Sequence, residues 1–315
     1  MNKTEKKFCG KILMFGEYAL IFGSGALSVP YKQKYGRLTF APDASDNTVL
    51  NFREHLNGYF SHLKEIAANK KLLCRLRLDD LENDITNGLV FDSSLPIGYG
   101  LGSSGALVAA LYDRYAENPI PVSHDLTTAE LLTLKQQFAQ LESYFHGTSS
   151  GLDPLVSYLQ EAILVEGKDK LRVVNLPRGR GNGNEAVFLL DSGSPGETQP
   201  LVNWFTEECK RESFCNKVDN DFIPLTNGCI QSFLDDKTDV LFSQLKQLSQ
   251  FTLSHLRPMV PGHLNNVWEK GISSDACYLK LCGSGGGGMM LGFSRDMEKA
   301  RELLNGFELT VVRYF

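Results

Sequence analysis

The chain has 315 residues, 42% of them hydrophobic and 22% charged, a globular composition with room for one large or two moderate domains. Its formal net charge of −5 disfavours non-specific binding to nucleic acid or to an anionic membrane, so neither partner is expected. The seven cysteines are scattered without a C-x-x-C pair, which favours reduced thiols in a cytoplasmic protein over disulfides or a zinc site. The sequence shows neither an apolar run of about 20 residues that could span a membrane nor a secretion signal.

The first hundred residues predict mostly short β-strands. Residues 8–16 are apolar apart from Lys11, which predicts a strand ending at the glycine. An amphipathic helix is expected at residues 60–71. The acidic run at 79–84 is expected to be a solvated turn, because its carboxylates lack a regular spacing for a metal. Further strands are expected at residues 19–22, 26–29, 38–40, 49–52 and 72–78.

Beyond residue 105, helices and strands alternate, and the predicted class is α+β. Thr127 and Glu130 form a capping-box pattern, which predicts a helix that continues to residue 145. Glycine alternates with arginine and asparagine at residues 178–184, so a linker or a long hairpin tip is expected there, between a first domain at 1–180 and a second at 181–315. Other helices are expected after residue 105 and around 200–216, 237–256 and 296–305, and other strands at 186–190, 278–282, 289–293 and 307–314.

The chain is organised around a glycine-rich loop at residues 95–106. Gly98, Gly100 and Gly102 have no Cβ to keep the backbone away from a ligand, and a helix follows them. Unpaired N–H groups and the positive end of the helix dipole gather at such a point, so the loop predicts a phosphate site. The lysine of the P-loop pattern is absent. The dinucleotide pattern GxGxxG matches at Gly100, Gly102 and Gly105, but the acidic candidate, Asp125, stands beside the capping box and not at a strand end.

Four side chains have the chemistry that such a loop needs. Glu142 falls in the apolar row of its helix, so it is either a magnesium ligand or a glutamate at the rim of that row. Ser104 is the matching second magnesium ligand or a plain helix N-cap. Asp153 precedes a proline, so we expect an extended or turn conformation that directs its carboxylate into a cleft. Lys11 is expected to be buried and to pair with Asp153, either for catalysis or as a structural salt bridge.

A second run of small residues occupies positions 283–288. Six small residues exceed what a β-turn requires, so a second backbone clamp over the phosphates is expected. His146 borders a glycine- and hydroxyl-rich loop at 146–154, where we expect a hydrogen-bonded histidine and not a catalyst.

Taken in order, these segments resemble the GHMP kinase superfamily and, within it, the mevalonate kinase family. Residues 10–20 are similar to the family's GKxxLxGEHAV, residues 95–106 to its LPxGxGLGSSAA phosphate loop, and residues 280–288 to its KLTGAGGGGC. Glu142 and Asp153 stand eleven residues apart, as in the family, and Asp191 and Thr198 fall in a segment similar to its DTG…T…LV.

The resemblance implies a two-domain GHMP kinase fold, with a ribosomal protein S5 domain 2-like N-terminal domain, a ferredoxin-like C-terminal domain and the active site between them. It implies a cytoplasmic kinase, monomeric or homodimeric, that uses ATP and Mg²⁺ to phosphorylate the primary hydroxyl of a small molecule, mevalonate, in isoprenoid biosynthesis. The implied catalytic residues are Asp153 and Lys11, the magnesium ligands Ser104 and Glu142, and the substrate contacts Glu17, Tyr18, Asp153 and Thr198. The implied nucleotide contacts are Pro96, Gly98, Gly100, Leu101, Gly102, Ser103, Ser104, Gly105, Gly283, Ser284, Gly285 and Gly286.

Two departures leave other functions open. Tyr18 stands where mevalonate kinases have a histidine, and Gly105 follows Ser104; both features are similar to phosphomevalonate kinases. Phosphomevalonate kinase or another GHMP kinase is therefore the alternative enzyme. A catalytically dead nucleotide-binding regulator is the alternative from another class, although the intact set of catalytic and metal-binding side chains argues against it.

Overall fold

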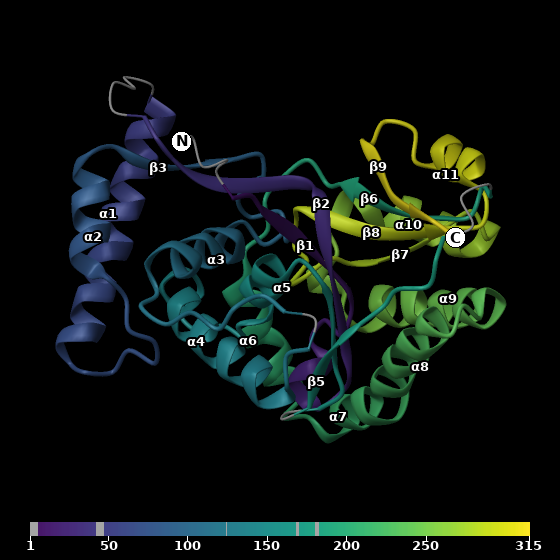
Figure 1. The fold of residues 1–315 in the computed structure, drawn as a ribbon. Helices are drawn as coiled ribbons and strands as arrows, with labels where there is room; N and C mark the ends of the chain where they lie inside the picture. The colour runs from purple at the N-terminus through teal and green to yellow at the C-terminus, as the bar shows by residue number, and fades with distance from the viewer. Residues whose placement is uncertain (1–5, 42–46, 124, 168–169, 180–182) are drawn as a thin grey trace. The chain divides into compact units, whose positions relative to one another are not determined.

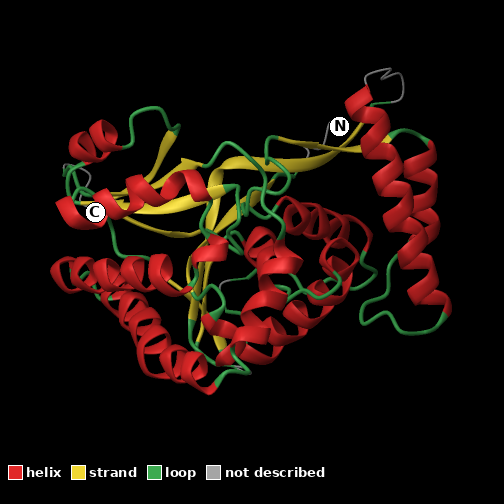
Figure 2. Ribbon diagram, turned by 180° about the vertical axis from the view of Figure 1, so that it is seen from behind, coloured by secondary structure: helices red, strands yellow, loops and turns green. Residues whose placement is uncertain are grey.

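The computed structural model describes residues 6–41, 47–123, 125–167, 170–179 and 183–315, without the side chains of residues 47–54, 146 and 198. Helices and strands are mixed along the chain (Figures 1 and 2), which confirms the α+β class. The α-helices are α1 (Asn47–Ala68), α2 (Leu78–Thr86), α3 (Ser103–Tyr115), α4 (Thr128–His146), α5 (Leu152–Leu159), α6 (Thr198–Glu208), α7 (Glu212–Lys217), α8 (Ile223–Leu234), α9 (Thr238–His255), α10 (Asn265–Ser274) and α11 (Met297–Leu303). The strands are β1 (Phe8–Phe15), β2 (Ala26–Phe40), β3 (Leu89–Ser93), β4 (Ala162–Val165), β5 (Leu171–Val174), β6 (Ala186–Asp191), β7 (Tyr278–Leu281), β8 (Met289–Ser294) and β9 (Leu309–Tyr314).

The chain divides into two compact units that are interleaved in sequence. The first unit contains residues 1–11, 30–96 and 102–161, and the second contains residues 12–29, 97–101 and 162–315. The chain therefore passes from one unit to the other within β1, within β2 and inside the glycine-rich loop. The predicted domain boundary at 180/181 falls on residues outside the described part, so it stays a prediction.

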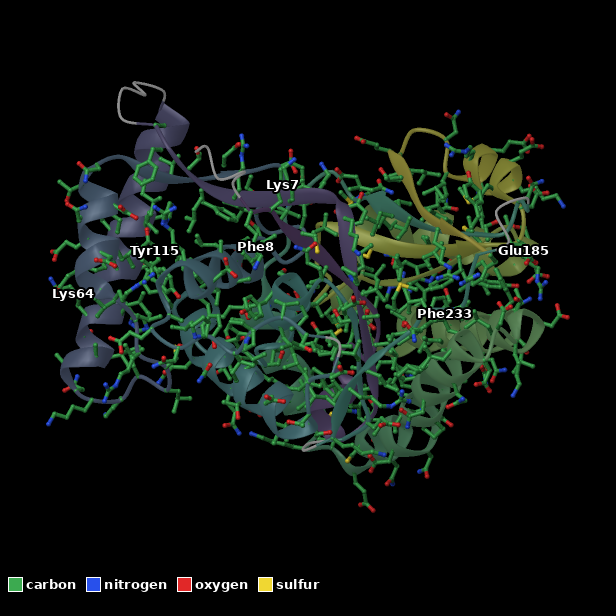
Figure 3. The ribbon with its side chains drawn as sticks, in the orientation of Figure 1. Lys7, Phe8, Lys64, Tyr115, Glu185 and Phe233 are labelled. Atoms are coloured by element: carbon green, nitrogen blue, oxygen red, sulfur yellow. The ribbon has the colours of Figure 1, made fainter. Side chains whose placement is uncertain are left out.

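In the first unit, α3 packs against α4 and α5 around an aromatic cluster. The rings of Tyr112, Phe138 and Tyr158 meet edge to face, with centroids 4.9–5.5 Å apart. Such contacts add to the free energy gained from burying the rings. Helices α1 and α2 lie side by side (Figures 1 and 2). Lys64 of α1 is exposed (Figure 3), and its Nζ lies 3.1 Å from an Oε1 of Glu82 on α2.

In the second unit, four strands form a sheet in the order β7-β8-β6-β9, with antiparallel pairing throughout. Phe188 and Phe293 are buried in this sheet, and Phe293 stacks on Phe15 at 5.9 Å. Helices α9 and α10 contact β7, and the indole of Trp268 on α10 donates to Ser249 Oγ of α9 at 2.8 Å. The core of this unit therefore lies where these helices meet the sheet.

A second sheet has the order β1-β2-β4-β5, and β3 pairs with β2 beside this path. The β2–β3 pair is antiparallel, with Leu38 opposite Phe91, and Phe91 fills the space that a side chain at Gly36 would need. Among the described helices, none is both long enough and apolar enough to cross a bilayer.

Strong local signals were predicted correctly. Helix α4 begins directly after Thr127, whose hydroxyl accepts the N–H of Glu130, and the Glu130 carboxylate accepts the N–H of Thr127. This is the predicted capping box. Strands β1, β6, β7, β8 and β9 and helices α3, α9 and α11 also match their predicted ranges closely.

Several expectations for the first hundred residues are wrong. Residues 19–22 form a 3₁₀ helix (Ala19–Phe22), because Tyr18 and Gly23 adopt positive φ and turn the chain. Residues 49–52 belong to α1; in the stretch 72–78, Leu76 forms an isolated bridge with Ala116, and Leu78 is already the first residue of α2. The acidic run 79–84 lies in α2, where Asp79 and Asp80 occupy the first turn and favour the helix dipole. Elements that were not predicted are β3, β4, β5, α5, α8 and α10.

Candidate active site

Helix α3 begins where the glycine-rich loop enters the first unit. Its N-cap is Gly102, with φ 77°, and no side chain caps the helix, so the N-cap interpretation of Ser104 is wrong. A Cβ on Gly102 would lie 2.9 Å from Cγ of Lys11, which explains why only glycine fits there. The first N–H groups of α3 have no partner within the helix, so this end can bind an anion.

Glu142 of α4 lies beside this helix end and is only 3% exposed. Ser104 Oγ donates to its Oε1 at 2.9 Å, and Ser149 Oγ donates to its Oε2 at 2.5 Å. Burial and, after it, the charge of Asp153 raise the pKa of Glu142 to about 7, although the two serine hydrogen bonds and Lys11 act in the opposite direction. The expected buried carboxylate is therefore present, and hydroxyl groups contact both of its oxygens.

Lys11 and Asp153 form the ion pair that was expected. Lys11 of β1 is 4% exposed, and its Nζ lies 3.0 Å from Oδ2 of Asp153, whose side chain is partly exposed. Asp153 does not have the expected extended or turn conformation, because it is the second residue of α5. Pro154 is tolerated there, since the first turn of a helix needs no N–H donor. A Cβ on Gly105 would lie 2.8 Å from the carbonyl carbon of Asp153, so α3 and α5 approach closely at this glycine.

The other half of the loop, residues 97–101, packs inside the second unit. The N–H of Gly196 donates to the Gly98 carbonyl at 3.0 Å, and the N–H of Met289 donates to the Tyr99 carbonyl at 3.2 Å. A Cβ on Gly100 would collide with the Cys282 carbonyl oxygen. Gly100 thus admits other protein backbone, and the approach of a ligand to this loop stays a prediction.

The glycine run at 283–288 is a strongly bent backbone segment. The run contains five glycines and Ser284. All five glycines have positive φ, which a residue with a side chain rarely adopts. The N–H of Gly286 donates to the Met259 carbonyl, and the N–H of Gly288 donates to the Ser194 carbonyl, both at 2.6 Å. The run is therefore held against two other loops of its unit, and its role as a phosphate clamp stays a prediction.

Two predicted substrate residues make contacts within the second unit. Glu17 forms a buried ion pair with Lys280 of β7. Tyr18 Oη donates to the Ser284 carbonyl at 2.5 Å, its ring packs on Phe205, and burial raises its pKa. These contacts do not establish a role in substrate binding, so that role stays a prediction. Thr198 is the first residue of α6, and its side chain lies outside the described part, as does that of His146 at the end of α4.

The predicted residues thus fall into two groups. Lys11, Ser104, Glu142 and Asp153 come together in the first unit, where Gly102, Ser103 and Gly105 form the helix start. Gly98, Gly100 and Leu101 lie with the 283–288 run in the second. Pro96 is the last residue of its stretch of the first unit, partly buried. The sequence interpretation missed Ser149 as a partner of Glu142 and Lys280 as a partner of Glu17. Lys280 could have been found, because a lysine in an apolar strand needs an opposite charge beside it.

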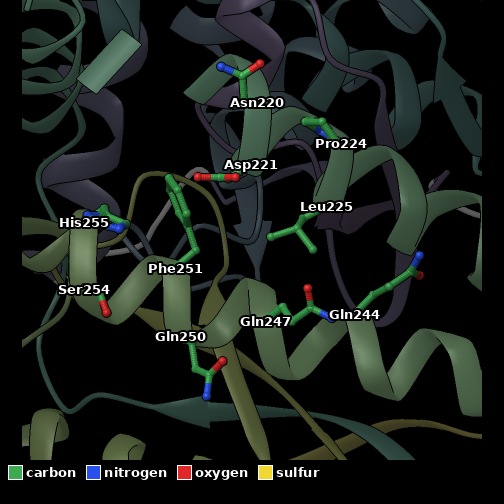
Figure 4. A pocket seen from close by; sticks show the side chains of 10 residues that line it. All are labelled: Asn220, Asp221, Pro224, Leu225, Gln244, Gln247, Gln250, Phe251, Ser254 and His255. Atoms are coloured by element: carbon green, nitrogen blue, oxygen red, sulfur yellow. The ribbon is translucent and has the colours of Figure 1, made fainter. Parts of the chain in front are cut away.

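A groove of about 580 Å³ lies elsewhere in the second unit, between α9 and the start of α8 (Figure 4). Asp221, Phe251 and His255 line it together with glutamine side chains of α9. None of its lining residues is a predicted site residue. The candidate active site therefore rests on the cluster in the first unit.

The donor set of that cluster fits a hydrated magnesium ion. A serine hydroxyl and a carboxylate oxygen 2.9 Å apart are hard oxygen ligands beside a helix N-terminus that suits phosphate. The neighbouring charges of Glu142 and Asp153 repel each other, which a cation would relieve. Over the described residues there is no group of three or more His, Cys, Asp or Glu side chains of the kind that holds zinc.

Comparisons with known proteins show which proteins this chain resembles. The family model for the GHMP kinases N terminal domain matches residues 63–161. The mevalonate kinase of Dictyostelium discoideum is 21% identical over 90% of this chain and 85% of its own length. The crystal structure of L. major mevalonate kinase with R-mevalonate is 18% identical, with a TM-score of 0.63 over 96% of this chain and 90% of that one. The structure of Streptococcus pneumoniae phosphomevalonate kinase with phosphomevalonate and AMPPNP is 16% identical, with a TM-score of 0.59 over 97% and 99%.

The structural matches show that the chain has the two-domain fold of these kinases, and the sequence matches extend along most of its length. The chain carries a GHMP kinases N terminal domain at residues 63–161 and is similar along most of its length to mevalonate kinases, which indicates a phosphotransferase with an alcohol acceptor.

Proposed function

We propose that the protein transfers the γ-phosphoryl group of ATP to the primary hydroxyl of mevalonate, giving 5-phosphomevalonate for isoprenoid biosynthesis. The observation that carries this proposal is the Lys11–Asp153 ion pair, with Nζ and Oδ2 3.0 Å apart, in the same unit as the Ser104–Glu142 contact. Relatives named mevalonate kinase match 90% or more of the chain, which supports mevalonate as the acceptor.

Asp153 is the residue that we assign to the acceptor hydroxyl. Its side chain is partly exposed at the start of α5, so it can reach a substrate, whereas Lys11 is buried behind it. Lys11 holds the carboxylate in place through the ion pair, and its charge favours the negative charge that spreads over the transferring group. The pair would therefore orient the hydroxyl and accept its proton.

The start of α3 is the part that we assign to ATP. Backbone N–H groups of Ser103, Ser104 and Gly105 face the end of the helix, where phosphate oxygens are favoured. Ser104 and Glu142 would hold Mg²⁺, which would neutralise phosphate charge during the transfer. In the second unit, the loop at 97–101 and the run at 283–288 are proposed nucleotide contacts, and Glu17, Tyr18 and Thr198 are proposed substrate contacts.

The alternative acceptor is phosphomevalonate. It is favoured by Tyr18 and by the fold likeness to the phosphomevalonate kinase structure. A second phosphate on the acceptor would require additional basic side chains around it.

The proposal is tested by an ADP-release assay with mevalonate, phosphomevalonate, galactose and homoserine as acceptors. We expect the highest kcat/KM with mevalonate, strict dependence on a divalent cation, and a single new phosphomonoester in the ³¹P spectrum of the product. If only phosphomevalonate is turned over, mevalonate is not the acceptor and the protein is a phosphomevalonate kinase. Binding of ATP without transfer to any acceptor would favour a regulator.

We also propose that the protein works in the cytoplasm, as a monomer or a homodimer. All seven cysteines are free thiols, which fits a reducing compartment. The net charge of −5 supports the absence of nucleic-acid and anionic-membrane partners. The domains proposed are residues 1–180 and 181–315.

A further inference from the structure

The carboxylate of Glu142 is held at both of its oxygens by hydroxyl groups from different segments. Ser104 at the start of α3 donates to Oε1 at 2.9 Å, and Ser149 in the loop between α4 and α5 donates to Oε2 at 2.5 Å. Two donors on opposite oxygens fix the rotation of the carboxylate plane, which one donor would leave free.

The hydroxyl of Ser149 is itself oriented by its loop. It accepts the N–H of Gly151 at 3.0 Å, so its own proton remains for Glu142. Gly147 is the C-cap of α4 and Gly151 is the N-cap of α5, with φ of 69° and 71°. A Cβ on Gly151 would collide with the Lys135 carbonyl of α4. The loop therefore packs against the same helix that carries Glu142, which fixes the distance between the two side chains.

We propose that Ser149 is a positioning residue that orients Glu142 for the divalent cation. This inference rests on the magnesium site in the proposed function. A cation at that site needs a lone pair of Ser104 Oγ and the Oε1 of Glu142, so the contact between these two groups must rearrange when it binds. The hydrogen bond from Ser149 to Oε2 is on the other oxygen and remains in place, which keeps the carboxylate directed at the ion. Groups that orient metal ligands in this way typically contribute 10- to 100-fold to metal affinity.

The test is a titration of the whole, ligand-free protein with Mn²⁺ alone, with the free ion followed by its electron paramagnetic resonance signal. We expect Ser149→Ala to weaken Mn²⁺ binding about 10-fold or more. Ser149→Thr, which retains the hydroxyl, should restore binding. Ser149→Cys, which has similar volume but only a weak donor, should not restore it. The matched control is Thr148→Ala, an exposed position in the same loop, which should bind Mn²⁺ like the wild type.

In the kinase assay, Ser149→Ala should raise the Mg²⁺ concentration needed for half-maximal rate, while kcat at saturating Mg²⁺ changes less than threefold. A purely structural role would instead lower the melting temperature of the alanine and threonine variants alike. The inference is overturned if the wild type, Ser149→Cys and Ser149→Ala bind Mn²⁺ with equal affinity. If the alanine variant does not fold, the Mn²⁺ affinities of Ser149→Cys and Ser149→Thr are compared instead, and equal affinities overturn the inference.

The variant Glu142→Gln separates this inference from the proposed function. If the wild type binds Mn²⁺ no better than Glu142→Gln, the proposed metal site is wrong and the inference falls with it. If Mn²⁺ binding depends on both Glu142 and Ser149 but mevalonate is not phosphorylated, the acceptor is wrong and the inference stands.

Discussion

The buried carboxyl group of Glu142 should make the stability of the ligand-free protein depend on pH. Burial and the charge of Asp153 raise its pKa in the folded protein to about 7, from a usual value of 4.5. The folded protein therefore keeps a proton that the unfolded chain has already lost between these pH values. The free energy of unfolding contributed by this group is fully present below about pH 4.5 and is lost as the pH rises through 7.

The magnitude follows from the difference between these two pKa values. At about 1.4 kcal/mol for each pH unit, the loss amounts to about 3 kcal/mol. Glu142→Gln has the same shape but cannot ionise, so it avoids this loss. Relative to the wild type, the variant should gain about 2.5 kcal/mol in unfolding free energy between pH 5 and pH 8, because part of the loss has already occurred by pH 5.

The assay is urea unfolding at four pH values from 5 to 8, without divalent cations, followed by the fluorescence of the two tryptophans. The matched control is Glu65→Gln, which changes an exposed glutamate of α1 and should follow the wild-type pH profile. Parallel pH profiles of wild type and Glu142→Gln would refute the reasoning, since they would show that the carboxyl group ionises alike in the folded and unfolded chain.

Other substitutions test separate parts of the structure. Asp153→Ala should lower kcat at least 100-fold but change the affinity for ATP only several-fold, because transition-state stabilisation is lost without ground-state binding; an unchanged kcat would remove Asp153 from the mechanism. Gly100→Ala places a side chain at φ 75° against the Cys282 carbonyl, so urea unfolding should show a loss of at least 1–2 kcal/mol, and wild-type stability would contradict the packing described. Thr127→Ala removes the cap of α4 and should cost about 1 kcal/mol in the same measurement, whereas a change below 0.3 kcal/mol would show that the cap is unimportant.

The elements with strong local signals could be predicted from the sequence. The capping box of Thr127 and Glu130 and the long helical period located α4, and the uninterrupted apolar run located β1. Short segments were less predictable, because an apolar run of four to eight residues fits a helix or a strand equally well. Residues 49–52 became part of α1, and residues 19–22 became a 3₁₀ helix between Tyr18 and Gly23, which both adopt positive φ.

The sequence by itself determined which side chains of the site need partners. A lysine inside an apolar strand and a glutamate in an apolar helix row cannot be buried alone, because an unpaired charge in a protein interior is strongly disfavoured. The pairing of Lys11 with Asp153 was thus predictable, and so was the burial of Glu142.

Only the tertiary structure decided how those needs are met. It brought Ser149 to the second oxygen of Glu142 and Lys280 to Glu17, and it packed Gly100 against the Cys282 carbonyl. Residue type and spacing carry no record of such contacts, because a hydrogen bond or a close approach depends on positions that the chain reaches only after its helices and sheets have packed. The chemistry of the family is therefore visible in the sequence, and its geometry is a property of the folded chain.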